Sequence, residues 1–138
     1  LSAMKHIITG ILLSLMSTVG WSESIYQYDC TFPYFSDENE AKQKQKNDYT
    51  GVYIVTIEGD GNYSGVLSGS AGAASLIVVP GNGLVNLFEI TPSAVVNITT
   101  LQPDFTQGTA KAVHSRHAAL PDYDYWAPTQ FYGTCTIK

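Results

Sequence analysis

Apolar and polar residues alternate along most of the chain with a period of two residues, in short runs that turn residues separate. This period is typical of β-strands whose two faces meet different surroundings. The pattern predicts about eight strands, at residues 25–32, 50–58, 63–68, 75–79, 84–90, 94–100, 109–116 and 131–137. Because the connections are mostly short, we expect a single antiparallel meander in which each strand pairs with the next.

The clearest turn follows the strand at residues 50–58. Asp60-Gly61 lies there between two alternating runs, which is the strongest short-range sequence pattern for a β-hairpin. Asp60, Asn62 and Ser64 also match the start of a calcium-binding loop. The twelfth position of that loop is Ala71, where a bidentate acid is required. We therefore interpret the segment as a hairpin turn and predict no metal site.

The two cysteines lie near opposite ends of the chain, at Cys30 and Cys135. In the predicted first strand Cys30 shares a face with three large aromatic residues, and in the last strand Cys135 shares a face with Phe131 and Ile137. We predict a disulfide between them, which in the chain-entropy model stabilises the fold by about 4 to 5 kcal/mol. The first and last strands must then be neighbours. The sheet is therefore expected to close into a small barrel or a sandwich.

Residues 36–47 break the β pattern. Ser36 can cap a helix, acidic residues follow it, and Lys42, Lys44 and Lys46 suit the negative end of a helix dipole. Ala41 is the only apolar residue of the segment, so a helix here has nothing to bury. We predict one short surface helix near residues 36–47.

The start of the chain predicts export. From Met4 to Ser22 a cationic residue, an apolar run and small residues succeed one another, as in a secretory signal peptide. The run is shorter than the roughly 20 apolar residues that a membrane span needs. We expect residues 1–22 to be absent from the exported protein. The first three residues would be a remnant of cloning or of a misassigned start, and the others would be the cleaved leader. Residues 23–138 would form one disulfide-closed β domain, secreted or periplasmic, with no stable membrane insertion after cleavage.

The charge of the chain limits its partners. The formal net charge is −5, and the lysines at positions 42, 44 and 46 are diluted by neighbouring acids. Phosphate backbones and anionic membranes require clustered cations, so nucleic acid is excluded as an expected partner. An unknown small molecule or a protein remains as the partner, and no cofactor is indicated.

The densest group of chemically active residues begins at His114, near the end of the predicted strand at 109–116, and continues to Trp126. We predict that it forms a localised ligand-binding surface at a strand end, in a loop that the sheet holds in place. If the strand continues, His114 and His117 point to opposite faces and cannot share a metal ion. The predicted binding residues are His114, Arg116, His117, Asp122, Tyr123, Asp124, Tyr125 and Trp126.

Glu89 is a further acid of interest. It alternates onto a face with Val85 and Leu87, so it could lie inside a barrel lumen, but we expect it to face solvent. Asn62 and Asn97 each begin a glycosylation pattern, which matters only in a eukaryotic secretory pathway.

No motif in the sequence names a reaction. The leading hypothesis is a non-enzymatic exported barrel or sandwich that binds a small apolar or aromatic ligand or a protein partner. The first alternative is a small exported hydrolase or isomerase that uses the group from His114 to Asp124, with His114 or His117 as general base and Arg116 holding an anion. The second is a structural or inhibitory protein without a pocket. A cavity lined by His114, Arg116 and Glu89 would favour chemistry, and a filled core would exclude a ligand.

Overall fold

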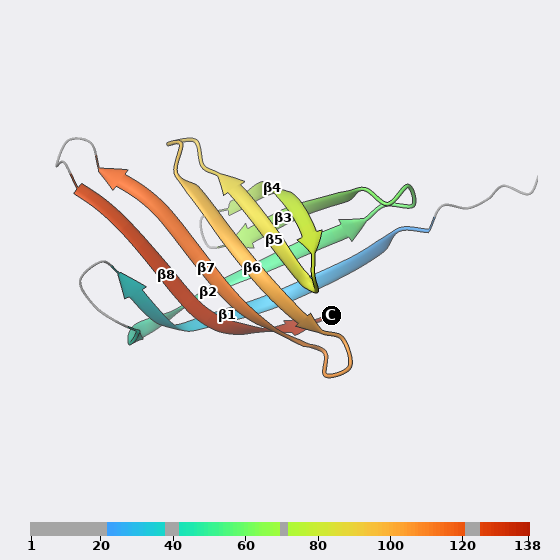
Figure 1. Ribbon diagram of the computed structural model, residues 1–138, viewed down its shortest axis with the longest axis horizontal. Helices are drawn as coiled ribbons and strands as arrows, with labels where there is room; N and C mark the ends of the chain where they lie inside the picture. Colours follow the sequence, from blue (N-terminus) through green and yellow to red (C-terminus); the bar gives the residue numbers. More distant parts are fainter. Residues whose placement is uncertain (1–21, 38–41, 70–71, 121–124) are drawn as a thin grey trace, which may run out of the picture.

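The chain folds into a closed antiparallel barrel in which all eight strands follow one another around the wall (Figure 1). The computed structural model describes residues 22–37, 42–69, 72–120 and 125–138. The strands are β1 (Ser24–Asp37), β2 (Gln43–Ile57), β3 (Tyr63–Gly69), β4 (Gly72–Gly81), β5 (Leu84–Ile90), β6 (Val96–Asp104), β7 (Thr109–Leu120) and β8 (Tyr125–Ile137). The predicted all-β meander is confirmed, and of the two predicted architectures the barrel is present.

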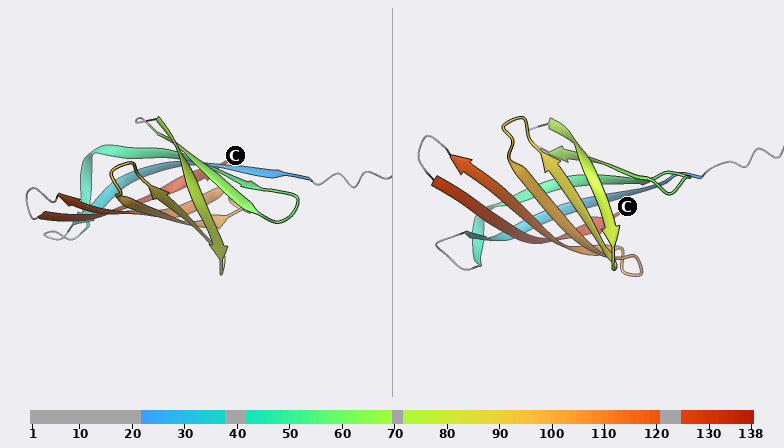
Figure 2. Two further views of the ribbon diagram at one scale, coloured as in Figure 1. Left: turned by 90° about the horizontal axis from the view of Figure 1, so that it is seen from above. Right: turned by 45° about the horizontal axis from the view of Figure 1, so that its top comes forward.

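The barrel closes where β1 pairs with β8 (Figures 1 and 2). Cys30 lies directly opposite Cys135 in this pairing, and a disulfide joins them across Cα atoms 3.9 Å apart. Both cysteines are buried, at 3% exposure, so they point into the interior as predicted. The disulfide therefore locks together the two strands whose contact turns an open sheet into a barrel.

A β-bulge at Pro33 bends β1 next to this closure. Phe32 and Pro33 together occupy the space opposite the single residue Gly133, because the register with β8 shifts between Thr31 and Tyr34. A Cβ atom on Gly133 would lie 2.0 Å from the carbonyl oxygen of Thr31. Only glycine therefore permits the close approach of the two backbones at this point.

The interior is filled in its middle by large side chains. Tyr28, Phe32, Tyr53, Leu87 and Leu101 are all between 0% and 1% exposed. The facing positions on β7 and β8 carry small residues, among them the buried Ala110 and Ala112, and these leave space for the aromatic rings. Large and small side chains thus interdigitate, which is how a narrow barrel reaches the packing density of a protein core.

The predicted helix near residues 36–47 is wrong for the part that the structure describes. Ser36 and Asp37 continue β1 and pair with β8, and Lys44 pairs with Tyr34 from β2. Residues 38–41 lie outside the described residues. The charged segment has no apolar stripe to bury as a helix, so backbone pairing with the neighbouring strands determines its structure.

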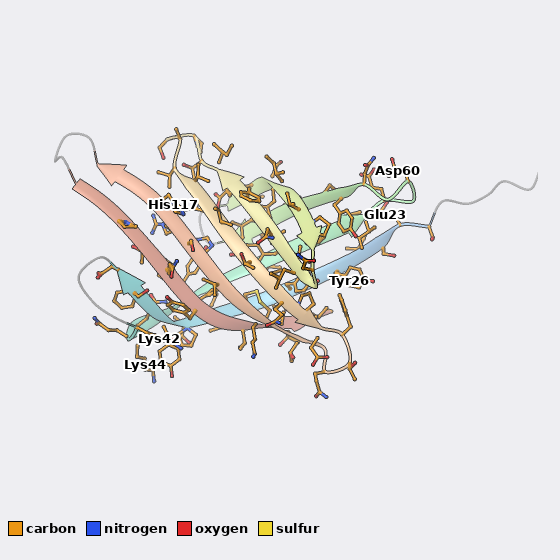
Figure 3. The ribbon with its side chains drawn as sticks, viewed as in Figure 1. Glu23, Tyr26, Lys42, Lys44, Asp60 and His117 are labelled. Carbon is orange, nitrogen blue, oxygen red and sulfur yellow. A yellow bond between two sulfur atoms is a disulfide. The ribbon has the colours of Figure 1, made fainter. Side chains whose placement is uncertain are left out.

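Lys42 illustrates how this segment is held. Its ammonium group lies 4.8 Å from the ring centre of Tyr34 and 5.3 Å from that of Tyr132, on the outside of the barrel (Figure 3). Cation–π contacts with two tyrosine rings therefore hold Lys42, in place of the interaction with a helix dipole that the sequence pattern indicated.

Several strands extend beyond their predicted ends because pairing continues past the alternating pattern. Pro80 pairs with Val85 at the end of β4, and Pro103 pairs with Ala110 at the end of β6. The turn at Asp60 is as predicted: its carboxylate accepts a hydrogen bond from the backbone N–H of Asn62 at 2.9 Å, and Gly61 has a φ of 86°. Within the described residues, no helix is long and apolar enough to cross a membrane.

Loss of the disulfide should lower stability substantially. We expect Cys135→Ser to reduce the free energy of unfolding by about 2–5 kcal/mol, because the long loop between the cysteines is then unconstrained in the unfolded chain. Urea unfolding of the oxidised wild type, the reduced wild type and the variant measures this. If all three unfold at the same urea concentration, backbone pairing alone closes the barrel.

Gly133 provides a second test of the closure. We expect Gly133→Ala to cost about 1–3 kcal/mol or more, because its new methyl group overlaps the backbone of β1. Gly81→Ala is the matched control, since a Cβ atom there meets nothing within 4 Å. Equal stability of the two variants in thermal unfolding would show that β1 and β8 are not in this register.

Candidate functional site

The barrel has two open ends, and their chemistry differs. The start of β1, the end of β8 and the turns around Asp60, Asn82 and Phe105 lie at one end. The other end carries the turns between β3 and β4, between β5 and β6 and between β7 and β8. Lys42 and Tyr26 mark these opposite ends in Figure 3.

A cavity of about 450 Å³ opens at the second end, which we call the His114 mouth. Aromatic side chains of Tyr49 and Phe131 form part of its wall, and polar groups come from β5, β6 and β7. Its remaining lining is mostly small residues of β3 and β4 and the turn at Thr91 and Pro92. The cavity has the size of a small-molecule pocket and combines an apolar wall with a few convergent polar groups.

Three of these polar groups lie in one row across adjacent strands. Glu89 on β5 pairs with Asn97 on β6, which in turn pairs with Arg116 on β7. The Asn97 amide donates a hydrogen bond to the Glu89 carboxylate at 3.1 Å. The other amide atom, Asn97 Oδ1, is buried and has no hydrogen-bond partner among the described residues. The row therefore holds an anion, an unpaired acceptor and a cation at the rim of one cavity.

His114 lies one layer deeper than Arg116, on the same face of β7. Its side chain is only 2% exposed, and the rings of Tyr49, Phe131 and Phe32 surround it at centroid distances of 5.2, 5.9 and 6.0 Å. Burial, together with the nearby positive charge of Arg116, lowers the pKa of His114 to about 4. The imidazole is therefore neutral at neutral pH.

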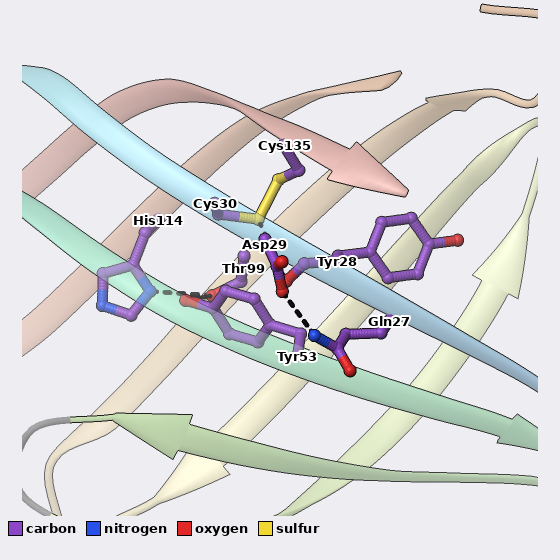
Figure 4. Close-up of a disulfide and its surroundings, with 8 residues drawn as sticks. All are labelled: Gln27, Tyr28, Asp29, Cys30, Tyr53, Thr99, His114 and Cys135. Atoms are coloured by element: carbon purple, nitrogen blue, oxygen red, sulfur yellow. Dashed lines mark hydrogen bonds between the residues drawn. A yellow bond between two sulfur atoms is a disulfide. The ribbon is translucent and has the colours of Figure 1, made fainter. Parts of the chain in front are cut away.

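A chain of hydrogen bonds runs from His114 to the cavity. Thr99 donates to the Tyr53 hydroxyl at 3.2 Å, and its oxygen lies 2.7 Å from His114 Nδ1 (Figure 4). Because the Thr99 proton is committed to Tyr53, His114 Nδ1 must be the donor in the second bond. Tyr53 in turn bonds Tyr49. The chain therefore ends at the Tyr49 hydroxyl, in the wall of the His114 mouth.

Both rim charges act on that hydroxyl. Burial raises the pKa of Tyr49, Glu89 raises it further, and the Tyr53 hydrogen bond and Arg116 oppose the increase. Burial also raises the pKa of Tyr53, so both phenols stay protonated at physiological pH. Glu89 and Arg116 therefore act in opposite directions on a phenol that lines the cavity with them.

The predicted site residues are only partly brought together. His114 and Arg116 face the cavity, and His117 faces solvent on the opposite side of β7, as alternation predicted (Figure 3). Residues 122–124 lie outside the described residues. Tyr125 and Trp126 begin β8, and their side chains are likewise outside the described part. The two histidines cannot share an ion, and no group of three His, Cys, Asp or Glu residues in the described ranges could hold a metal.

The structure changes the interpretation of two residues. His114 was predicted near the end of a strand, in a group expected to form a binding surface, but its side chain faces the interior and is a buried member of a hydrogen-bond chain. Glu89 was expected to face solvent, but it lines the cavity on the same face as the buried Leu87. Alternation along the strand had already offered the correct orientation of Glu89.

Other cavity residues were not recognised in the sequence. Asn97 was noted only as a possible glycosylation site and Phe131 only as an aromatic residue of the last strand, while Tyr49 lay just outside the predicted strand at 50–58. Their common position depends on which strands pair, since they come from β6, β2 and β8. The alternation within each strand could have placed them on the inner face, but not at the same end of the barrel.

The opposite end forms a second cavity of about 440 Å³, the Phe105 mouth. It shares no lining residue with the His114 mouth, and its described lining contains no charged side chain. Phe105 is 60% exposed and packs on Tyr26 with ring centroids 5.2 Å apart. A larger depression of about 870 Å³ lies on the outer wall over β1, β7 and β8 and is lined partly by outward-facing threonines. The outer depression also has residues of opposite charge in its lining, with Phe105 beside them. The His114 mouth differs in that two aromatic rings, those of Tyr49 and Phe131, lie beside Glu89 and Arg116.

Comparisons with protein-family models, with curated proteins and with solved structures find no match to this chain. The interpretation of the site therefore rests on its geometry and chemistry.

The buried imidazole should make folding stability depend on pH. An ordinary histidine has a pKa of 6.5, whereas that of folded His114 is about 4, so the unfolded chain binds a proton at higher pH. This contribution is fully present above about pH 6.5 and is lost as the pH falls to about 4. It amounts to about 3 kcal/mol.

Denaturant unfolding at pH 7 and pH 4 checks this prediction. His114→Gln removes the titrating group but keeps a side chain that can bond Thr99, so its stability should fall less between these pH values than that of the wild type. An identical fall in both proteins would mean that His114 is not held neutral by burial.

Proposed function

We propose that this chain is a non-enzymatic, exported binding protein that holds a small aromatic molecule in the His114 mouth. The observation that carries the proposal is the convergence of Glu89, Asn97 and Arg116 at the rim of a 450 Å³ cavity with aromatic walls. An aromatic ring of the ligand would pack against Tyr49 and Phe131. Its polar substituent would reach the rim charges and the Tyr49 hydroxyl.

The aromatic wall supports a planar ligand. Tyr49 and Phe131 contact each other with ring centroids 5.3 Å apart at an interplanar angle of 41°. Tilted aromatic clusters of this kind favour a further ring packed against a face or an edge. The small residues Gly72 and Ala74 on the opposite side of the cavity leave space for that ring.

The cavity is lined by His114, Arg116 and Glu89, the set of residues that would favour chemistry. The low basicity of His114 nevertheless argues for binding over catalysis. A general base works best when its pKa lies near the operating pH, and burial holds the pKa of His114 at about 4. A neutral imidazole of such low basicity is a poor proton acceptor in a reaction but a stable part of a cavity wall. The lining of the His114 mouth therefore supports recognition of a ligand rather than hydrolysis or isomerisation.

Export is supported by the disulfide and by the expected leader. A Cys30–Cys135 disulfide is compatible with an extracellular or periplasmic location, where thiols oxidise. The expected leader ends at Ser22, and residues 1–21 lie outside the residues that the structure describes. Secretion is therefore part of the proposal and has its own test. The intact mass of the protein recovered outside the cytoplasm shows whether the leader has been removed.

Binding can be tested with single-ring compounds that carry different polar groups: phenol, benzamide, phenylacetate, 2-phenylethylamine and phenylalanine. We expect at least one of them to shift the amide NMR signals of Glu89, Asn97 and Arg116. We expect Ala74→Phe to abolish these shifts by filling the cavity. Ser75→Phe is the matched control, because the adjacent residue on β4 points to the outside and should leave binding unchanged.

Circular dichroism confirms that both variants are folded before binding is compared. Two results would contradict the proposal. One is the absence of shifts with every compound, and the other is binding that survives in Ala74→Phe, which would place the ligand elsewhere.

A further inference from the structure

We propose that the His114 mouth selects a zwitterion, a small aromatic molecule that carries both an ammonium group and a carboxylate. This inference rests on the proposed function, since it names the class of ligand for the same cavity. In the complex, Glu89 and Asn97 would receive the ammonium group and Arg116 the carboxylate.

The spacing of the two charges fits such a head group. Glu89 and Arg116 lie in register on either side of Asn97, each one strand away from it. Neighbouring strands are about 4.8 Å apart, so the two Cα atoms are separated by roughly 10 Å. Both residues line the same cavity. In the proposed complex an ammonium and a carboxylate on one carbon atom would bridge the gap between them.

The two rim charges do not neutralise each other. Glu89 and Arg116 form no ion pair within 4.0 Å, and the only salt bridge between described residues joins Lys138 to Asp29. A ligand with a carboxylate alone would satisfy Arg116 but would meet repulsion from Glu89. A ligand with an amine alone would face the reverse. A zwitterion is the class that gives both side chains an opposite charge.

The Asn97 amide gives a second reason to expect an ammonium group in the ligand. Its Nδ2 group is committed to Glu89, while its Oδ1 atom is buried without a hydrogen-bond donor. An unpaired buried acceptor is unfavourable, so a complex that provides a donor is stabilised relative to the empty cavity. An ammonium group has three protons. With a small rotation of the Asn97 amide it can donate to Glu89 and to Asn97 at once, which a carboxylate cannot do because it has no donor.

The wall between the charges is suited to the rest of the molecule. Tyr49 lines the cavity together with Glu89 and Arg116, so its ring can contact the part of the ligand next to the head group. Deeper in the cavity the neutral His114 ring and Phe131 offer an aromatic floor without a third charge. A ring attached to the zwitterion would therefore enter an uncharged environment.

The test compares three ligands that share one ring. Phenylalanine carries both charges, phenylacetate only the carboxylate and 2-phenylethylamine only the ammonium group. Isothermal titration calorimetry or NMR titration of the wild-type protein should give a dissociation constant for phenylalanine at least about tenfold lower than for either analogue, as loss of one charge-assisted contact predicts.

Variants assign each charge to its residue. In Glu89→Gln the advantage of phenylalanine over phenylacetate should disappear, since the ammonium group no longer has its partner. In Arg116→Gln the advantage over 2-phenylethylamine should disappear. Glu58→Gln and Lys111→Gln are the controls, because both residues are exposed and neither lines the His114 mouth.

The outcomes separate this inference from the proposed function. If phenylacetate or 2-phenylethylamine binds in the mouth as tightly as phenylalanine, the mouth is a site for aromatic compounds but not for zwitterions, and the inference is wrong. It is also wrong if the preference persists in both Glu89→Gln and Arg116→Gln. If no compound binds to the wild type, the proposed function itself fails. The wild-type comparison needs no variant, so it decides the question even if a variant does not fold.

Discussion

The pairing of β1 with β8 is the contact on which the remainder of the structure depends. An open meander of eight strands would leave two unpaired edges and no enclosed interior. Here Cys30 faces Cys135 across the closing pair, and Gly133 lets the backbone of β1 approach at the bulge near Pro33. Closure determines which side chains meet inside. The two mouths, the buried histidine and the row from Glu89 to Arg116 exist only because the first and last strands are joined.

The interior of the barrel changes in polarity along its axis, and this gradient positions the candidate site. The middle is apolar, with Tyr28, Phe32 and Leu101 almost completely buried. His114 marks the boundary, since its imidazole is buried but keeps one hydrogen bond through Thr99. Glu89 and Arg116 lie one residue pair further out, where the cavity opens to solvent. Polar groups thus appear only where water, a hydrogen bond or a ligand can satisfy them.

Much of the fold could be predicted from the sequence because β alternation is a local property. Cys30 and Cys135 lay on apolar faces of the first and last strands, which indicated closure. The turn at Asp60 could be predicted from its Asp-Gly pair alone. The helix expected near residues 36–47 failed because capping and charge spacing are weaker than pairing with two neighbouring strands. The sequence grouped His114 with Arg116 and named Glu89 as a possible third residue of a cavity, but it could not place Asn97 and Tyr49 beside them. The proximity of these residues depends on the pairing of β5 with β6 and of β6 with β7, and on the closure that brings β2 to the same mouth.

The difference between the two mouths is an argument for function in its own right. Each end of a narrow barrel must be covered by side chains or filled with water. At the Phe105 mouth, uncharged aromatic and aliphatic residues line the opening. The same solution was available at the His114 mouth, where apolar residues at positions 89 and 116 would add to the core without leaving any charge to be solvated. The His114 mouth instead carries an anion and a cation beside a buried amide oxygen that has no hydrogen-bond partner among the described residues. The proposed ligand would give Glu89 and Arg116 opposite charges and would give Asn97 Oδ1 a donor, and the proposal rests on this difference between the two mouths.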